Sequence, residues 1–202
     1  MKKDVKKLDV VFILDKSGSM GGSEKNTISS FNEYLEREKN NSFDTSITTV
    51  LFSDHYQYLH KGIPISQVEK LTENDYFVGG CTALYDALGN TISYMSQRKT
   101  DKVLFIIITD GYENASVEFN KAVIQKMIKN HSDWEFVYIG ADIDSYAVGG
   151  DLGIKEENIA NYAKNKKGIS RLFAAVGNFE CAMMNEDSCV SKDSWKDELK
   201  DY

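Results

Sequence analysis

Apolar residues in this chain gather in short runs, which are separated by polar turns and by segments with helical spacing. Residues 8–14 (LDVVFIL) and 103–109 (VLFIIIT) are almost continuously apolar and rich in β-branched side chains. That pattern is typical of strands buried on both faces of a parallel sheet. Residues 46–52 (SITTVLF) and 134–140 (WEFVYIG) predict two more strands of this kind.

Two shorter segments are predicted at the edges of the sheet. Residues 55–59 (HYQYL) alternate apolar and polar side chains and follow the strand at 46–52 very closely. A connection that short permits only an antiparallel hairpin. Residues 158–162 predict a final, short edge strand.

Between these strands, the apolar residues recur at helical spacing, which predicts helices. The predicted helices include residues 28–35, a segment that begins near Thr82, and residues 117–128, 145–152 and 172–183. In the helix at 117–128, Val123, Ile124, Met127 and Ile128 are expected to face the core.

Strands that alternate with helices predict right-handed crossovers and a parallel sheet covered on both faces. The expected fold class is α/β: a Rossmann-like, three-layer, doubly wound, mostly parallel sheet of six strands with one antiparallel edge strand. We expect a single domain over residues 1–184 and a charged C-terminal tail over residues 185–202. A chain of 202 residues can bury a sufficient core without disulfides or metals.

Composition narrows the setting in which the protein is expected to act. The net charge of −7 argues against a nucleic-acid backbone as the main partner. The three cysteines lack C-x-x-C spacing, and the basic N-terminus is not followed by a long apolar stretch, so we expect a cytoplasmic protein. No segment approaches the about 20 apolar residues of a membrane span, so no membrane partner is expected.

Polar residues that could bind a cation follow two of the predicted inner strands. Asp15, Ser17 and Ser19 come directly after the strand at 8–14, and Asp110 comes directly after the strand at 103–109. In an extended turn, alternate side chains point the same way, so the Asp-x-Ser-x-Ser spacing can bring three oxygens to one point. Thr82 adds a further hydroxyl at the start of a helix. Hydroxyl and carboxylate oxygens suit Mg²⁺, with Mn²⁺ and Ca²⁺ as alternatives.

In order and spacing, these five residues resemble the metal-ion-dependent adhesion site of von Willebrand factor A domains. The resemblance covers residues 8–183. Through the stretches GCTALYDALG and IIITDGYENAS, the chain looks most similar to the small, stand-alone bacterial and phage members of the family. It implies that Ser17, Ser19 and Thr82 ligate the metal directly, Thr82 only in the ligand-competent state. Asp15 and Asp110 are then expected to hold the metal through waters.

The resemblance also implies a function. Neutral inner ligands leave the ion electrophilic, so an acidic residue of a partner protein can complete its coordination. The expected function is therefore a divalent-metal-dependent protein-binding module. Two departures from the family pattern are Cys81, where many members have glycine, and Lys16 inside the motif.

Several alternatives stay open from the sequence. The five residues could simply cap helices and stabilise turns. The chain could be a Mg²⁺-dependent hydrolase or phosphoryl-transfer enzyme, although it lacks a G-x-x-x-x-G-K-[ST] loop and a Gly-x-Ser-x-Gly elbow. It could also be a structural subunit with a vestigial metal site.

Other polar and aromatic residues are expected to have ordinary structural roles. We expect Cys81 to be a small buried thiol, and Glu113 and Asn114 to lie in a solvated loop. Lysines 164, 166 and 167 are expected on a solvated surface. The aromatic side chains at 56, 58, 76 and 77 fit either ordinary packing or the border of a binding site.

Overall fold

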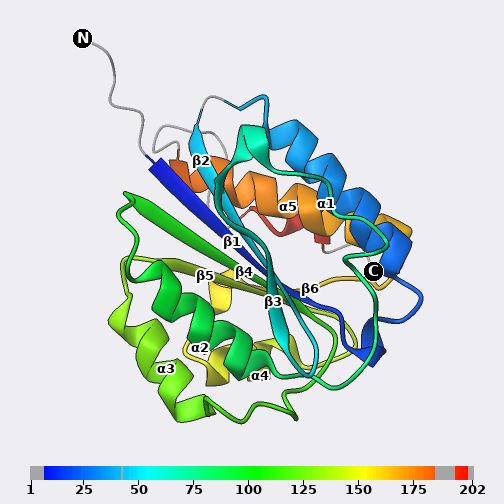
Figure 1. Cartoon of the computed structure of the whole chain (residues 1–202), viewed down its shortest axis with the longest axis vertical. Helices are drawn as coiled ribbons and strands as arrows, with labels where there is room; N and C mark the ends of the chain where they lie inside the picture. Colours follow the sequence, from blue (N-terminus) through cyan, green and yellow to red (C-terminus); the bar gives the residue numbers. More distant parts are fainter. Residues whose placement is uncertain (1–6, 42, 185–193, 200–202) are drawn as a thin grey trace.

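The computed structural model describes residues 7–41, 43–184 and 194–199 and contains one six-stranded sheet between two layers of helices (Figure 1). The strands are β1 (Lys7–Asp15), β2 (Asp44–Phe52), β3 (Tyr56–Pro64), β4 (Lys102–Thr109), β5 (Glu135–Gly140) and β6 (Ile159–Asn161). The α-helices are α1 (Glu24–Glu38), α2 (Leu84–Met95), α3 (Lys121–Asn130), α4 (Ser145–Asp151) and α5 (Lys166–Met184). Short 3₁₀ turns are η1 (Gly18–Met20), η2 (Ile65–Gln67), η3 (Glu156–Asn158) and η4 (Asp197–Leu199).

The strand order is β3-β2-β1-β4-β5-β6, and every neighbouring pair is parallel except β2 with β3. Strands β2 and β3 lie on one side of β1, and strands β4, β5 and β6 lie on the other. The parallel central strands β1 and β4 therefore end beside each other, at the edge of the sheet formed by the carboxyl ends of its parallel strands (the carboxyl edge). The prediction of a mostly parallel α/β sheet with one antiparallel edge strand is confirmed.

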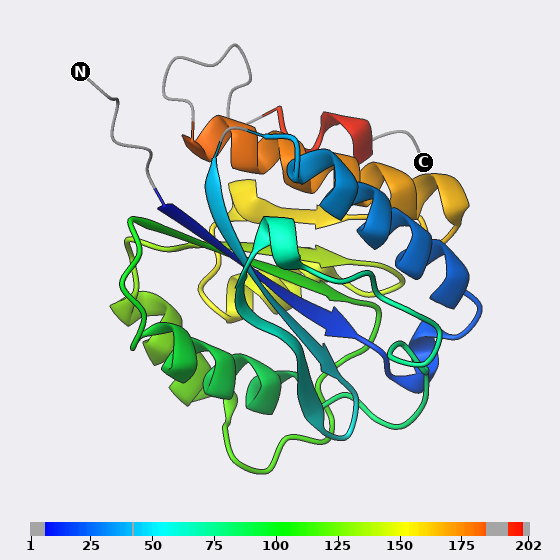
Figure 2. The same cartoon turned by 45° about the horizontal axis from the view of Figure 1, so that its top comes forward.

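The two faces of the sheet bury two separate apolar clusters. Figure 2 shows the helices that lie above and below the sheet. In β1, Val10, Phe12 and Leu14 join the cluster that α1 and α5 cover. Val11 and Ile13, which point the other way, join the cluster covered by α2, α3 and α4. This alternation explains why the strand must be apolar at almost every position.

Most predicted elements have different bounds in the structure, and for two of them the structure shows the reason. The edge strand β3 extends to Pro64, because its pairing with β2 continues to the Ser46–Pro64 register. Helix α3 begins at Lys121 rather than at residue 117. The Asp86 carboxylate accepts hydrogen bonds from the amides of residues 117–119, at 2.8–2.9 Å, and this holds them outside the helix.

The inward face predicted for α3 is also corrected. Ile124 and Ile128 are buried, but Val123 is 41% exposed. The buried face of α3 (Lys121–Asn130) therefore contains two of the four predicted residues, Ile124 and Ile128.

Part of the predicted C-terminal tail packs on the domain. The Trp195 side chain is fully buried, its ring meets that of Phe179 edge-on at 5.5 Å, and its indole donates to the Glu157 carbonyl. Residues 185–193 and 200–202 of that tail lie outside the described residues. Within the described residues, none of the helices combines the length and the apolar character that crossing a membrane requires.

Candidate metal centre

The structure places the five predicted metal-site residues at the carboxyl edge of the sheet. Asp15 is the last residue of β1, and Asp110 directly follows β4. Ser17 and Ser19 lie in the turn between β1 and α1, and Thr82 lies two residues before α2. These segments are far apart in sequence, but the sheet topology brings their ends together.

Asp15 is completely buried and hydrogen-bonded on both carboxylate oxygens. Its Oδ1 accepts the Ser17 amide at 2.6 Å, and its Oδ2 accepts the Thr109 hydroxyl at 2.5 Å. Burial raises the pKa of Asp15, and these hydrogen bonds oppose that rise. The negative charge of Asp110 also raises the pKa of Asp15, so the two carboxylates lie close enough to repel each other.

The two serines present their hydroxyls side by side. Ser17 Oγ and Ser19 Oγ are 3.0 Å apart, with Ser17 buried and Ser19 exposed. The turn that carries them is fixed by the loop before α2: the Gly18 amide donates to the Gly80 carbonyl at 3.0 Å, and the Gly79 amide donates to the Lys16 carbonyl at 2.9 Å. This contact between the two loops was not predicted from the sequence.

Gly111 marks the point on which the oxygens converge. A Cβ atom built on Gly111 would lie 2.8 Å from Thr82 Oγ1, 3.2 Å from Ser19 Oγ and 3.6 Å from Asp15 Oδ2. Two hydroxyls and one carboxylate oxygen from three segments therefore border one small space, and only a residue without a side chain leaves it open. A hard divalent cation binds to oxygen atoms grouped in this way.

Thr82 is held in place by Asn114. The Asn114 side-chain oxygen accepts the Thr82 amide at 2.9 Å, and the Asn114 amide donates to the Thr82 carbonyl at 3.0 Å. Glu113 accepts the Tyr85 amide at 2.9 Å and so fixes the first turn of α2. Both residues lie in the loop after β4, as predicted, and Asn114 is exposed. The sequence did not predict that they also connect this loop to the start of α2.

Asp110 has a different environment from Asp15. Its side chain is 1% exposed, and neither carboxylate oxygen accepts a hydrogen bond among the described residues. The Lys164 ammonium lies 2.6 Å from Asp110 Oδ2 as an ion pair, and it also donates to the Ser19 carbonyl. The prediction that Lys164 is a solvated surface residue was therefore wrong, since its side chain is only 20% exposed.

The other residues near the site also differ from expectation. Cys81 is exposed rather than buried, and the hydrogen-bonded carboxylate of Asp54 raises the pKa of its thiol. Tyr76 is buried and donates its hydroxyl to the Asp15 carbonyl, which makes it part of the packing. Phe77 and Tyr112, in contrast, are 78% and 57% exposed in the loops beside the site.

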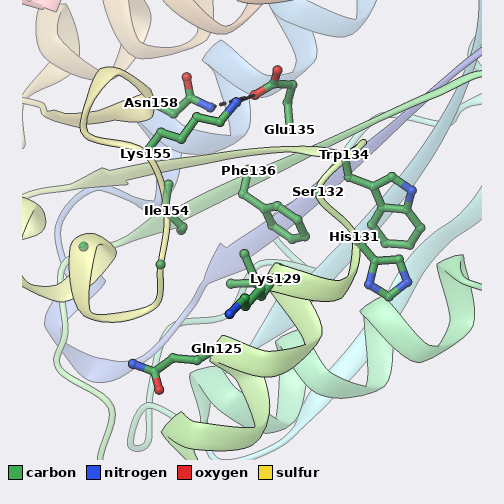
Figure 3. Close-up of a pocket in the computed structure, with 13 residues that line it drawn as sticks. Gln125, Lys129, His131, Ser132, Trp134, Glu135, Phe136, Ile154, Lys155 and Asn158 are labelled. Carbon is green, nitrogen blue, oxygen red and sulfur yellow. Dashed lines mark hydrogen bonds and ion pairs between the residues drawn. The ribbon is translucent and has the colours of Figure 1, made fainter.

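A separate pocket of about 370 Å³ lies at the opposite edge of the sheet, between the end of α3 and the start of β5 (Figure 3). His131 and Trp134 lie beside each other in it, with ring centroids 4.0 Å apart. Glu135 accepts the Asn158 amide at 2.9 Å and lies 3.7 Å from Lys155 Nζ. The pocket shares no residue with the five predicted metal-site residues.

Solved structures of other proteins share this fold. The chain is 18% identical to proximal thread matrix protein 1 from the mussel byssus, solved with a zinc-occupied MIDAS motif, at a TM-score of 0.64. That match covers 88% of this chain and 46% of the mussel protein, so the chain spans less than half of its length. The von Willebrand factor domain of the pilus tip protein Mfa5 from Porphyromonas gingivalis matches at a TM-score of 0.67 and 12% identity, over 92% of this chain and 99% of that one.

A curated relative extends the comparison to a virus. The chain is 27% identical, over 133 residues, to a probable bifunctional E2/E3 enzyme, R795, of Acanthamoeba polyphaga mimivirus. The match covers 62% of this chain but 10% of that protein. The model of the von Willebrand factor type A domain family matches residues 9–185. Since this match includes most of the chain and all five residues described above, the protein belongs to the von Willebrand factor type A domain family.

Proposed function

We propose that the protein binds one divalent cation, Mg²⁺, and through it an acidic residue of a partner protein. The residues that would hold the cation are Asp15, Ser17, Ser19, Thr82 and Asp110. The main support is the Asp110 carboxylate, which is buried at the end of β4, accepts no hydrogen bond among the described residues and has the Lys164 ammonium as its charged contact. A buried carboxylate in that state is costly unless a positive charge compensates it.

The chemistry of the side chains supports a role in binding an anionic group. The three hydroxyls are neutral, so they would order a cation without cancelling its charge. The two carboxylates lie at the buried side of the site, and we propose that they hold the cation through waters. When bound, the cation supplies an electrophilic position for an incoming carboxylate. A cation also explains how a chain with a net charge of −7 could attract an acidic partner.

The choice of Mg²⁺ rests on the donor atoms. Hydroxyl and carboxylate oxygens are hard ligands, which favour Mg²⁺, Mn²⁺ or Ca²⁺ over softer ions. The mussel protein was solved with zinc in its MIDAS motif, so zinc belongs in any metal screen. Cytoplasmic action and a bacterial or phage origin remain predictions from the sequence.

Selection of peptides tests the proposed function without knowledge of the natural partner. The immobilised protein is exposed to a random peptide display library in Mg²⁺, and bound peptides are eluted with a chelator. We expect the selected peptides to share an Asp or Glu, and to lose binding when that residue becomes Asn or Gln. Thr82→Ala should bind none of them, whereas Thr100→Ala, at the opposite edge of the sheet, should bind as the parent does. Peptides that bind equally well in chelator contradict the proposal.

The enzymatic alternative has its own test. The chain matches a tenth of the mimivirus protein, so the name of that protein is not evidence for the same activity in this chain. A Mg²⁺-dependent hydrolase would turn over substrates in a phosphatase and esterase screen, and the turnover would be lost in Asp110→Asn. We expect no turnover above that of this variant.

A further inference from the structure

Lys164 is the one residue at the carboxyl edge that brings a positive charge into contact with the predicted metal-site residues in the described part of the chain. Its ammonium contacts the Asp110 carboxylate at 2.6 Å and donates to the Ser19 carbonyl. It therefore touches two of the three segments that would hold the cation. Its side chain is 20% exposed, although the neighbouring lysines at 166 and 167 are exposed.

The backbone on both sides of Lys164 is anchored. Before it, the Tyr162 amide donates to the Gly140 carbonyl at 2.9 Å, which continues the contact between β6 and β5. After it, the Asn165 side chain accepts the Gly168 amide at 2.9 Å and caps the start of α5. Lys164 thus stands on a short connection from the sheet to α5, and the anchored backbone directs it to the site.

The contact compensates the charge that a metal would otherwise compensate. Asp110 is almost completely buried and accepts no hydrogen bond within the described residues, so the Lys164 ammonium is its closest source of positive charge. An ammonium and a divalent cation that approach the same carboxylate repel each other strongly in a part-buried site. The lysine and the metal therefore cannot both be bound there at full strength.

We propose that Lys164 is a built-in counter-ion of Asp110 that a divalent cation must displace, so that this lysine sets the metal affinity of the site. The inference rests on the proposed function, because it requires that the site binds a cation. It adds that the metal-free protein is stabilised by its own lysine, and that metal binding releases the Lys164 side chain from Asp110.

Replacement of the lysine by an apolar residue of similar length tests this directly. We expect Lys164→Met to bind Mg²⁺ and Mn²⁺ about tenfold more tightly than the parent in calorimetric titrations, since one like charge has been removed from a part-buried site. In chelator, the same variant should melt at a lower temperature than the parent, because Asp110 loses its compensating charge. In saturating Mg²⁺ the deficit should shrink or disappear.

Two further variants separate this role from ordinary stabilisation. Lys167→Met removes the same formal charge from an exposed position near the start of α5 and should change neither the affinity nor the melting temperature. The double variant Asp110→Asn/Lys164→Met removes both partners, so its stability in chelator should return toward that of the parent. It also keeps the test valid if the single variant does not fold.

The outcomes distinguish this inference from the proposed function. If the parent binds Mg²⁺ but Lys164→Met binds it with equal or lower affinity, the inference is overturned and the proposed function stands. A variant that is destabilised to the same extent with and without metal also overturns it. If neither protein binds any divalent ion, both proposals fail together.

Discussion

The two ends of strand β1 each bury an aspartate, and they neutralise it in different ways. At the amino end, Asp9 is 3% exposed and accepts two hydrogen bonds from the Arg98 guanidinium, at 2.9 and 3.2 Å. At the carboxyl end, Asp15 is completely buried and accepts only an amide and a hydroxyl. Its neighbour Asp110 accepts no hydrogen bond among the described residues and contacts the flexible side chain of Lys164.

The comparison distinguishes Asp9, a carboxylate with a structural role, from the carboxylates that we propose bind a ligand. A planar guanidinium with two parallel bonds satisfies Asp9 within the fold. The pair Asp15 and Asp110 has no guanidinium partner, and the single ammonium of Lys164 contacts only Asp110 of the two. Burial of an acid alone does not therefore indicate a metal site. We propose that a buried pair of carboxylates with one displaceable lysine does.

The largest expected effect on stability is at the amino end. Arg98→Met leaves the Asp9 carboxylate buried without a counter-charge, which should lower the free energy of unfolding by about 3 kcal/mol. Chemical denaturation measures this change. Metal affinity should stay within about twofold of the parent, because the pair lies at the opposite end of β1 from the metal centre.

The double variant Asp9→Asn/Arg98→Met sharpens that comparison. It removes both charges, so much of the lost stability should return. If the double variant is no more stable than Arg98→Met, the loss arises from packing of the arginine rather than from the buried charge.

The next effect concerns Gly111. In Gly111→Ala the new Cβ would lie 2.8 Å from Thr82 Oγ1 and 3.2 Å from Ser19 Oγ, so the two hydroxyls must separate. We expect Mg²⁺ affinity to fall at least about tenfold, the cost of misplacing ligands by a fraction of an ångström. Calorimetric titration measures it, and Gly150→Ala, where a Cβ meets nothing within 4 Å, is the matched control. Unchanged affinity in Gly111→Ala would place the cation elsewhere.

Another buried acid, Glu180 between α1 and α5, offers a test by pH. Burial and, to a lesser extent, the charge of Glu38 raise the pKa of Glu180 to about 8, against hydrogen bonding by Tyr34 and the charge of Arg37. In the unfolded chain, Glu180 loses its proton near its ordinary value of 4.5. Its contribution to stability is therefore complete below that value and is lost as the pH rises through about 8.

Glu180→Gln, which cannot ionise, should remove this part of the pH dependence. Relative to the parent, the variant should melt at a higher temperature at pH 9 and show a much smaller difference at pH 5. Glu33→Gln, on the exposed side of α1, should follow the parent at both values. A Glu180→Gln variant whose difference from the parent is the same at both pH values contradicts the assignment.

The smallest expected effect is at Asn114. Asn114→Ala removes the side-chain bond to the Thr82 amide but keeps the backbone bond to the Thr82 carbonyl. Thr82 should become less well placed, and Mg²⁺ affinity should fall by about threefold to tenfold, the equivalent of one hydrogen bond. If the affinity falls as far as in Thr82→Ala, Asn114 contributes to the site directly.

Much of the fold could be predicted because its signal is local. The apolar runs that form β1 and β4 stop where Asp15 and Asp110 begin, so the ends of the two central strands could be located from the sequence. Parallel pairing then puts both aspartates at one edge. The five predicted residues follow from these strand ends and from the family resemblance. Their role as metal ligands is still a prediction.

The features that were missed depend on contacts between distant parts of the chain. Lys164 reaches the Ser19 carbonyl across 145 positions, and nothing in the sequence around Lys164 distinguishes it from the two lysines that follow. The start of α3 depends on the Asp86 carboxylate, which is more than 30 positions away. Asn114 and Thr82 are 32 positions apart. Local patterns cannot report such contacts, because each residue's own neighbourhood permits another role.

We propose above that Asp110 is buried without a hydrogen bond because it holds a cation. Its most direct test is a calorimetric titration of the parent and of Asp110→Asn with Mg²⁺, with Asp133→Asn, an exposed position, as the control. We expect one binding site in the parent and in the control, and an affinity at least about a hundredfold lower in Asp110→Asn, because a buried charge that holds the ion through water is removed. Equal affinity in all three proteins would contradict it.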